Sequence, residues 1–194
     1  MRLALAAAAL AAALSAPGAG AQDARRGAAL AAHACGNCHG ADGRSQMAGI
    51  PSLAGQPAPF VTMQMILFRE GLRIAPPMGD FARGIPDADI EDLAAFFAAQ
   101  PPGPPDDRAP REPALFDRGR ALSERMRCGA CHLPDYRGRE QIPRLAAQRE
   151  EFLAATLAEY RDNRRVGSDT QMNAVMYGVA DADIAALAHY LAQQ

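Results

Sequence analysis

Cys35-Gly36-Asn37-Cys38-His39 is the stretch that decides the fold of this chain, and it recurs as Cys128-Gly129-Ala130-Cys131-His132. The two stretches contain all 4 cysteines of the 194-residue sequence. In each stretch two residues separate the cysteines, and a histidine follows the second cysteine directly. The chain therefore carries one chemical unit twice, and each unit combines two thiols with one imidazole.

The sequence around these stretches is also repeated, at an offset that stays close to the spacing of the two motifs. A repeat of this length predicts two tandem domains, 22–100 and 114–194. The proline-rich segment 101–113 between them predicts a stiff, extended linker. The matched segments are Arg26–Leu30 with Arg118–Leu122, Ile50–Gln56 with Ile142–Gln148, Phe60–Glu70 with Phe152–Asp162, and Asp87–Ile90 with Asp181–Ile184.

Apolar residues recur at helical spacing through both repeats, and no segment alternates as a strand would. The clearest helices begin at Asp87-Ala88-Asp89 and Asp181-Ala182-Asp183, where carboxylates oppose the positive end of the helix dipole. We therefore expect an all-α fold. The expected helices are 24–34, 59–69 and 87–99 in the first repeat, and 115–126, 150–161 and 181–192 in the second.

The N-terminus has the pattern of a secretory signal peptide. Arg2 precedes an apolar run from Leu3 to Leu14, and Ala19-Gly20-Ala21 supplies small residues for cleavage. The run is too short for a transmembrane helix, which needs about 20 residues. We therefore expect residues 1–21 to be removed on export to the periplasm, and the mature chain not to span the membrane.

The pattern C-x-x-C-H is the attachment signature of c-type haem. The thiols of Cys35 and Cys38 would bond the two vinyl groups of one haem, with His39 on its iron. Cys128, Cys131 and His132 would hold a second haem in the same way. Alternatives fit less well, because the βαβ context of a thioredoxin-like pair and the short pair spacing of a zinc site are both missing, and disulfides leave the two histidines unexplained.

The sixth iron ligand is expected to be methionine, which with histidine is the usual pair in electron-transfer haems. Met78 lies nine residues before Asp87, and Met172 lies nine before Asp181. No other pair of methionines is symmetric in the repeat, so we predict Met78 and Met172 as ligands. Pro76-Pro77 suggests that Met78 sits on a loop. Met176 is the alternative in the second repeat.

Four further residues are of types that can bind haem iron or haem propionates, but we expect each of them at the surface. His33 lies before the first motif, and His189 corresponds to Ala95, so symmetry gives neither a ligand role. Arg73 and Arg165 occupy matched positions. They could pair with haem propionates, but we expect solvated charges.

The chain resembles the dihaem class I cytochromes c of the cytochrome c4 group. The features that carry the resemblance are the paired C-x-x-C-H motifs, the Ile-Pro-x-Leu-Ala-x-Gln segments and the methionine placed nine residues before each closing helix. The resemblance implies two tandem class I cytochrome c domains, packed as pseudo-symmetric halves. It also implies that a carbonyl, of Pro51 or Pro143, orients each proximal imidazole, and that Phe96 and Tyr190 pack the last helix of each half on the first. Pro86 and Ala180 stand where these proteins often have a serine, which weakens the helix caps.

The expected function is to carry single electrons, with two covalently attached haem c groups as cofactors. The predicted partners are a quinol-oxidising complex or a dehydrogenase upstream, and a terminal oxidase or reductase downstream. The formal net charge of −2 gives no sign of nucleic-acid binding. One alternative is the dihaem cytochrome subunit of a dehydrogenase complex such as flavocytochrome c sulfide dehydrogenase. The other is an enzyme, a dihaem peroxidase, which needs a haem with an open sixth position.

Overall fold

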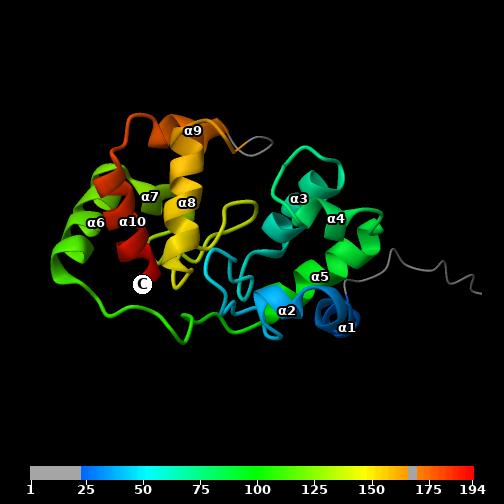
Figure 1. The fold of residues 1–194 in the computed structure, drawn as a ribbon. Coiled ribbons are helices and arrows are strands. Elements are labelled where there is room, and N and C mark those ends of the chain that lie inside the picture. Colours follow the sequence, from blue (N-terminus) through cyan, green and yellow to red (C-terminus); the bar gives the residue numbers. More distant parts are fainter. Residues whose placement is uncertain (1–22, 166–169) are drawn as a thin grey trace, which may run out of the picture.

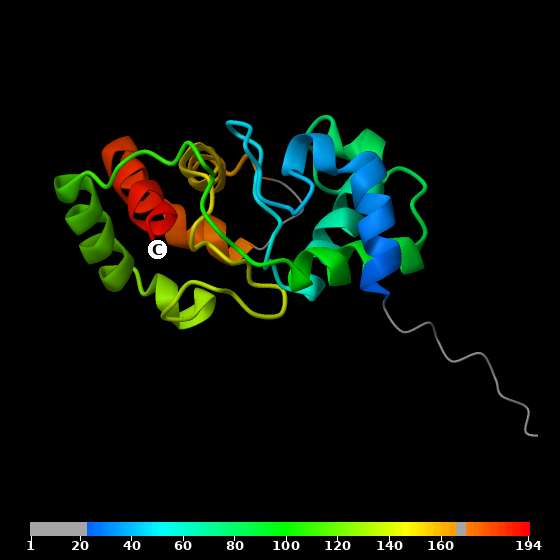
Figure 2. The same cartoon turned by 90° about the horizontal axis from the view of Figure 1, so that it is seen from below.

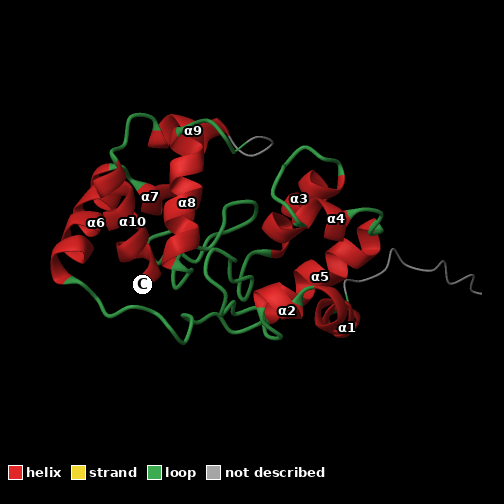
Figure 3. Cartoon of the chain, viewed as in Figure 1, coloured by secondary structure: helices red, strands yellow, loops and turns green. Residues whose placement is uncertain are grey.

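The computed structural model of the chain describes residues 23–165 and 170–194. Over these ranges the chain folds into helices and loops (Figure 3), and the one β-type contact is the isolated bridge between Arg139 and Ile142. None of the described helices is long and apolar enough to cross a bilayer. The predicted signal peptide, residues 1–21, lies outside the described residues.

The described helices form two groups that follow the sequence repeat (Figure 1). Each group contains two long helices that cross, a third long helix against them, and two short helices. The first group is α1 (Ala24–Ala34), α2 (Gly36–His39), α3 (Ala58–Arg69), α4 (Met78–Ala82) and α5 (Asp87–Ala99). The second is α6 (Pro113–Arg125), α7 (Cys128–His132), α8 (Glu150–Arg161), α9 (Thr170–Met176) and α10 (Asp181–Ala192).

The six helices expected from periodicity are all present, and α1, α5, α8 and α10 have the expected bounds. The short helices α2, α4, α7 and α9 were not expected. The expectation of a loop at Met78 was wrong, because Met78 is the first residue of α4 and Pro77 is the residue that caps it. Proline suits the start of a helix, where its missing N–H costs no hydrogen bond.

The first and last long helices of each half lie against each other (Figure 2), and a glycine of the first helix is at each contact. A Cβ atom on Gly27 of α1 would lie 2.0 Å from the carbonyl oxygen of Asp92 and 2.9 Å from Cβ of Phe96. A Cβ on Gly119 of α6 would lie 2.0 Å from the Ala186 oxygen and 2.5 Å from Cβ of Tyr190. The two aromatic residues therefore pack where the resemblance placed them, against the first helix of their own half.

Arginines tie down the starts of the closing helices α5 and α10. The residues at their N-cap positions, Pro86 and Ala180, make no capping hydrogen bond with a side chain. Instead, Arg69 of α3 donates to the Ile85 oxygen at 2.9 Å and pairs with Asp87 at 2.7 Å. In the second half Arg161 of α8 bonds the Val179 oxygen and Asp181 in the same way. These contacts offset the missing serine caps.

The proline-rich segment between α5 and α6 is attached to both halves, so it is more than a spacer. Asp106 donates its backbone N–H to Gln46 at 2.9 Å, and Gln193 donates to the Ala109 oxygen at 2.8 Å. Asp107 accepts two hydrogen bonds from Arg149, at 3.0 and 2.9 Å. Since Arg149 also donates to the Ser45 oxygen at 3.2 Å, its buried guanidinium joins the linker to both halves.

We predict that Gly119→Ala destabilises the holoprotein by about 2 kcal/mol, because overpacking against the backbone of α10 outweighs the gain in helix propensity. Chemical denaturation monitored by circular dichroism measures the change. Arg120→Ala, on the outward face of the same helix, is the control and should stay within about 0.5 kcal/mol of the wild type. Equal stability of the two variants would contradict the crossing described here.

A pH dependence follows from the Asp107–Arg149 pair. The hydrogen bonds from Arg149 hold the pKa of Asp107 below its usual value, so the pair stabilises the folded chain above that usual value. The stabilisation should be lost as pH falls through the lowered pKa. Asp107→Asn should therefore be less stable than the wild type at neutral pH, with the difference shrinking below about pH 4. A difference that stays constant from neutral to acid pH would argue against this pair.

Candidate haem sites

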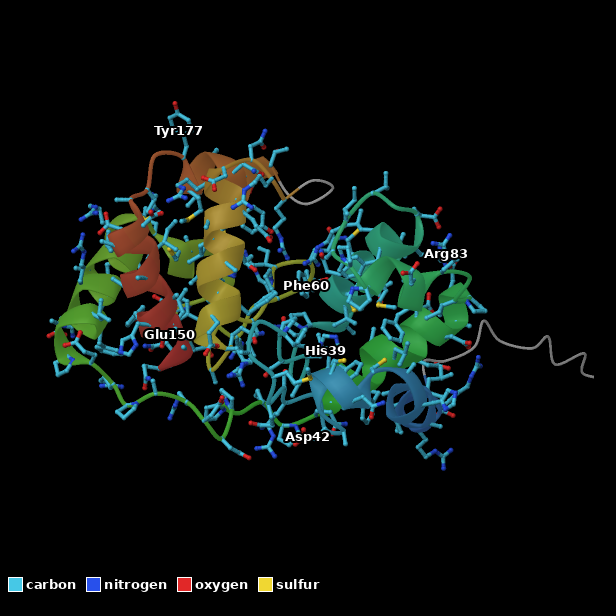
Figure 4. The ribbon with its side chains drawn as sticks, viewed as in Figure 1. His39, Asp42, Phe60, Arg83, Glu150 and Tyr177 are labelled. Atoms are coloured by element: carbon cyan, nitrogen blue, oxygen red, sulfur yellow. The ribbon has the colours of Figure 1, made fainter. Side chains whose placement is uncertain are left out.

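Each C-x-x-C-H motif lies at a short helix that ends in the histidine. Cys35 precedes α2 and His39 is the last residue of this helix, while α7 runs from Cys128 to His132. The turn of helix holds both cysteines and the histidine of each motif together, with the His39 N–H bonded to the Cys35 oxygen at 3.0 Å. Both imidazoles are buried. Figure 4 shows His39 on the part of the first half that lies toward the second.

The two histidine rings have the same hydrogen bond. Nδ1 of His39 lies 2.8 Å from the Pro51 oxygen, and Nδ1 of His132 lies 2.8 Å from the Pro143 oxygen. A carbonyl oxygen can only accept, so the proton is on Nδ1 and the lone pair is on Nε2. Burial also lowers the pKa of both histidines, which keeps the rings neutral. The expectation for Pro51 and Pro143 is confirmed, and each ring offers Nε2 to a metal.

The four cysteines, all within the described residues, are thiols and form no disulfide. Burial raises the pKa of Cys35 and Cys128, so these two groups are neutral thiols. Among the described residues no three histidine, cysteine or acidic side chains gather as a metal-binding cluster. Two adjacent thiols and one buried imidazole with a free lone pair fit a covalently attached haem in each half.

The predicted methionine ligands lie on the short helices before each closing helix. Met78 begins α4 and Met172 lies within α9, and both side chains are half-buried. Met172 packs against an apolar cluster that includes Leu122 of α6 and Leu187 of α10. Met176 is a member of that cluster and is fully buried. This packing favours Met176 as core and Met172 as ligand.

The surface expectation holds for His33 and is wrong for His189. His33 is exposed, whereas the His189 side chain is buried between α8 and the start of α6. Its Nε2 accepts the Glu112 backbone N–H at 2.9 Å, and its Nδ1 lies 3.0 Å from Glu150, which begins α8 (Figure 4). His189 therefore joins three segments of the second half, and both of its nitrogens are used.

Arg73 and Arg165 are not the solvated charges we expected. Arg73 is half-buried, and the side chain of Arg165 is 9% exposed. Each guanidinium lies over an aromatic ring of its own half, 4.4 Å from the Phe68 centroid and 5.2 Å from the Tyr160 centroid. Burial and the charge of Arg165 lower the pKa of Arg73 to about 10. Arg165 also pairs with Glu159 at 3.0 Å, so this cation already has an acidic partner within its own half.

Two buried glutamines were missed by sequence reasoning. Gln56 and Gln148 end the repeated Ile-Pro-x-Leu-Ala-x-Gln segments, so the repeat itself was the available signal. Each side chain crosses to the other half. Gln148 bonds the backbone of Ser52, and Gln56 bonds the backbone of Arg144, at 2.8–2.9 Å. The halves are therefore joined through the loops that hold the proximal histidines.

Two helical domains with one such site each define a dihaem c-type cytochrome. Residues 22–97 match the family described as cytochrome c oxidase, cbb3-type, subunit III, and residues 116–194 match the cytochrome c family. The cytochrome c4 of Pseudomonas aeruginosa is 34% identical over 176 residues, which cover 87% of each protein. The chain belongs to the cytochrome c4 family, and it is an electron-transfer protein with two covalently bound haem c groups.

Solved structures give the same result. A reduced cytochrome c4 from Pseudomonas stutzeri superimposes with a TM-score of 0.80 at 29% identity, covering 89% of this chain and 98% of that one. Thiosulfate dehydrogenase from Marichromatium purpuratum has a TM-score of 0.77 at 32% identity over 87% of this chain, but over 40% of that longer chain. A curated relative named thiosulfate dehydrogenase electron acceptor, from Stutzerimonas stutzeri, is 34% identical over 86% of this chain and 81% of that protein.

The two methionines of α9 can be separated by substitution. Met172→Ala should lower the reduction potential of one haem, because it removes the thioether that raises the potential. Met176→Ala should leave both potentials in place and instead lower the free energy of unfolding by about 2–5 kcal/mol, as expected for a cavity in the core. Redox titration and chemical denaturation of both holoproteins distinguish the roles. A drop in potential in Met176→Ala alone would exchange the assignments.

Met78→Ala tests the same assignment in the first half. The variant should lower the potential of the other haem and leave the haem affected by Met172→Ala unchanged, since each methionine serves its own half. Met63→Ala, in α3 and without a counterpart in the second repeat, is the matched control. Unchanged potentials in Met78→Ala would remove this residue from the ligand set.

Proposed function

We propose that the chain is a periplasmic carrier of single electrons, with residues 22–100 and 114–194 as its two haem domains. One observation carries the proposal. Both halves hold a buried, neutral imidazole whose Nδ1 is fixed by a proline carbonyl at 2.8 Å, beside a pair of thiols. An equal site in each half suits the passage of electrons from one half to the other.

The cysteines, histidines and methionines have different roles at each haem. Cys35 and Cys38 tether the first haem, and Cys128 and Cys131 the second. His39 with Met78 would hold the iron of the first haem, and His132 with Met172 would hold that of the second. Haem held in this way supplies a one-electron change between ferric and ferrous iron with no bond made. Two iron ligands from the protein at each haem would leave no position for a substrate, which favours a carrier over a peroxidase.

The remaining contacts keep the sites fixed and dry. Proline carbonyls hold the imidazoles, the helix crossings at Gly27 and Gly119 close each core, and Arg149 joins the halves. A fixed, low-dielectric surrounding limits the rearrangement that accompanies each change of charge. We infer that the donor is a quinol-oxidising complex or a dehydrogenase, and that the acceptor is a terminal oxidase or reductase.

A second candidate is the electron-accepting subunit of a dehydrogenase. It is supported by the relative from Stutzerimonas stutzeri that is named thiosulfate dehydrogenase electron acceptor, and by the likeness to the Marichromatium purpuratum thiosulfate dehydrogenase. These two proteins favour a sulfur-compound dehydrogenase as the partner.

The proposal is tested on the holoprotein purified from the periplasm of a host that matures c-type cytochromes. The protein should titrate reversibly in two one-electron steps. In the reduced state neither haem should bind carbon monoxide, and the protein should not turn over peroxide. Ready binding of carbon monoxide at one haem, or peroxide turnover, would favour the peroxidase. A dehydrogenase chain that copurifies in stoichiometric amount would favour the second candidate over the free carrier.

A further inference from the structure

The peptide group between Pro51 and Ser52 is bonded on both sides, by different halves of the molecule. Its carbonyl oxygen, on Pro51, accepts the Nδ1–H of His39 at 2.8 Å. Its N–H, on Ser52, donates to Oε1 of Gln148 at 2.8 Å. A single peptide group therefore lies between the proximal histidine of the first half and a side chain of the second.

The second half has the mirror arrangement. The carbonyl of Pro143 accepts Nδ1–H of His132 at 2.8 Å, and the N–H of the same peptide group, on Arg144, donates to Oε1 of Gln56 at 2.9 Å. Each glutamine also returns a hydrogen bond from Nε2, to the Ser52 oxygen at 2.9 Å or to the Arg144 oxygen at 2.9 Å. These second bonds fix the orientation of the amides, because a backbone oxygen accepts only from the NH₂ group.

Most side chains of this chain of hydrogen bonds are shielded from water. Ser52, Gln56, Gln148, His39 and His132 are each less than 8% exposed, while Pro51, Pro143 and Arg144 are half-buried. In such surroundings hydrogen bonds in series polarise one another, by roughly 10–30% per bond. A glutamine oxygen on the peptide N–H therefore makes the carbonyl at the other end of that peptide group a better acceptor.

A better acceptor strengthens the bond from Nδ1–H and makes the imidazole a stronger base at Nε2. A more basic ligand stabilises ferric over ferrous iron and lowers the reduction potential. The direction matters, because a loosened interface that admits water also favours the more highly charged ferric form and so also lowers the potential. Loss of the glutamine bond alone has the opposite sign, since it raises the potential.

We propose that Gln56 and Gln148 are positioning residues that act across the interface, each lowering the reduction potential of the haem in the opposite half. The inference rests on the proposed function, since it takes His39 and His132 as the iron ligands. It makes the potential of each half depend on whether the other half is docked. The Arg149 side chain makes a further contact between the halves, through Ser45 and Asp107, that does not touch either proline peptide.

The test is a redox titration of the holoproteins Gln148→Met and Gln56→Met. Methionine is unbranched and of similar length, so it fills the space, and its thioether is a much weaker acceptor for the peptide N–H than an amide oxygen. Gln148→Met should raise the potential of the first haem more than that of the second, and Gln56→Met should do the reverse. NMR of the partly reduced protein assigns each potential, because contacts with residues of α1 or α6 identify each haem.

A second readout follows the histidine itself. In the reduced, diamagnetic protein the Nδ1–H resonance of His39 should move upfield in Gln148→Met, as its hydrogen bond weakens, while that of His132 stays in place. Where Gln148→Met does not accumulate, Gln148→Asn serves, because its amide is one methylene too short to make both bonds.

The matched control is Arg149→Met. It removes the contacts to Ser45 and Asp107 but keeps the backbone N–H of residue 149, which donates to Gln148 at 2.9 Å. This variant should leave both potentials unchanged or lower them together. The inference is refuted if it raises the same potential as Gln148→Met, if a glutamine variant moves mainly the haem of its own half, or if the shifts are downward. A wild-type protein without reversible titration would instead refute the proposed function.

Discussion

The hydrogen bond from a buried histidine to a proline carbonyl is the constraint on which the rest of the structure depends. At 2.8 Å in both halves, this bond holds the proton of each ring on Nδ1 and leaves the lone pair on Nε2. For that carbonyl to stay in place, the loop that follows each C-x-x-C-H helix must be fixed, although it has no regular secondary structure. The loops between α2 and α3 and between α7 and α8 are fixed by each other, since they form the contact between the halves (Figure 1).

This arrangement explains which parts of the molecule could be predicted from sequence. The cysteine motifs, the repeat and the six long helices depend on local patterns, and all of them could be read from the residues. The short helices α2, α4, α7 and α9 have 4 to 7 residues, too few to show periodicity, and they form because neighbouring elements hold them. His189 was misplaced for a related reason. Its partners Glu112 and Glu150 are 77 and 39 residues away, and comparison with Ala95 of the other half reveals neither.

The two halves have the same backbone hydrogen bonds in the loop after each C-x-x-C-H helix, but different residues at the matching position. The carbonyl of Gly43 accepts from the N–H groups of Leu53 and Ala54, and the carbonyl of Tyr136 accepts from Leu145 and Ala146 in the same way. Gly43 has a positive φ of 77°, and Tyr136 adopts 54°, a conformation that costs a residue with a side chain more than it costs glycine. The cost is offset by packing, because the Tyr136 ring meets Tyr190 edge-on at 5.7 Å and its hydroxyl bonds Ser123. Sequence alone gave no reason to expect a tyrosine there.

The contact between the halves combines a symmetric part with an asymmetric one. Gln56 and Gln148 are the same residue of a duplicated segment, so one sequence feature yields two reciprocal contacts, as in an isologous dimer interface. Arg149 breaks this symmetry, because its counterpart Pro57 has neither a charge nor an N–H to offer. The symmetric part consists of amides and peptide groups, which do not titrate. Oxidation of either half therefore changes the charge next to this contact without adding or removing a proton there, and the hydrogen bonds that fix the histidines keep the same donors and acceptors in both redox states.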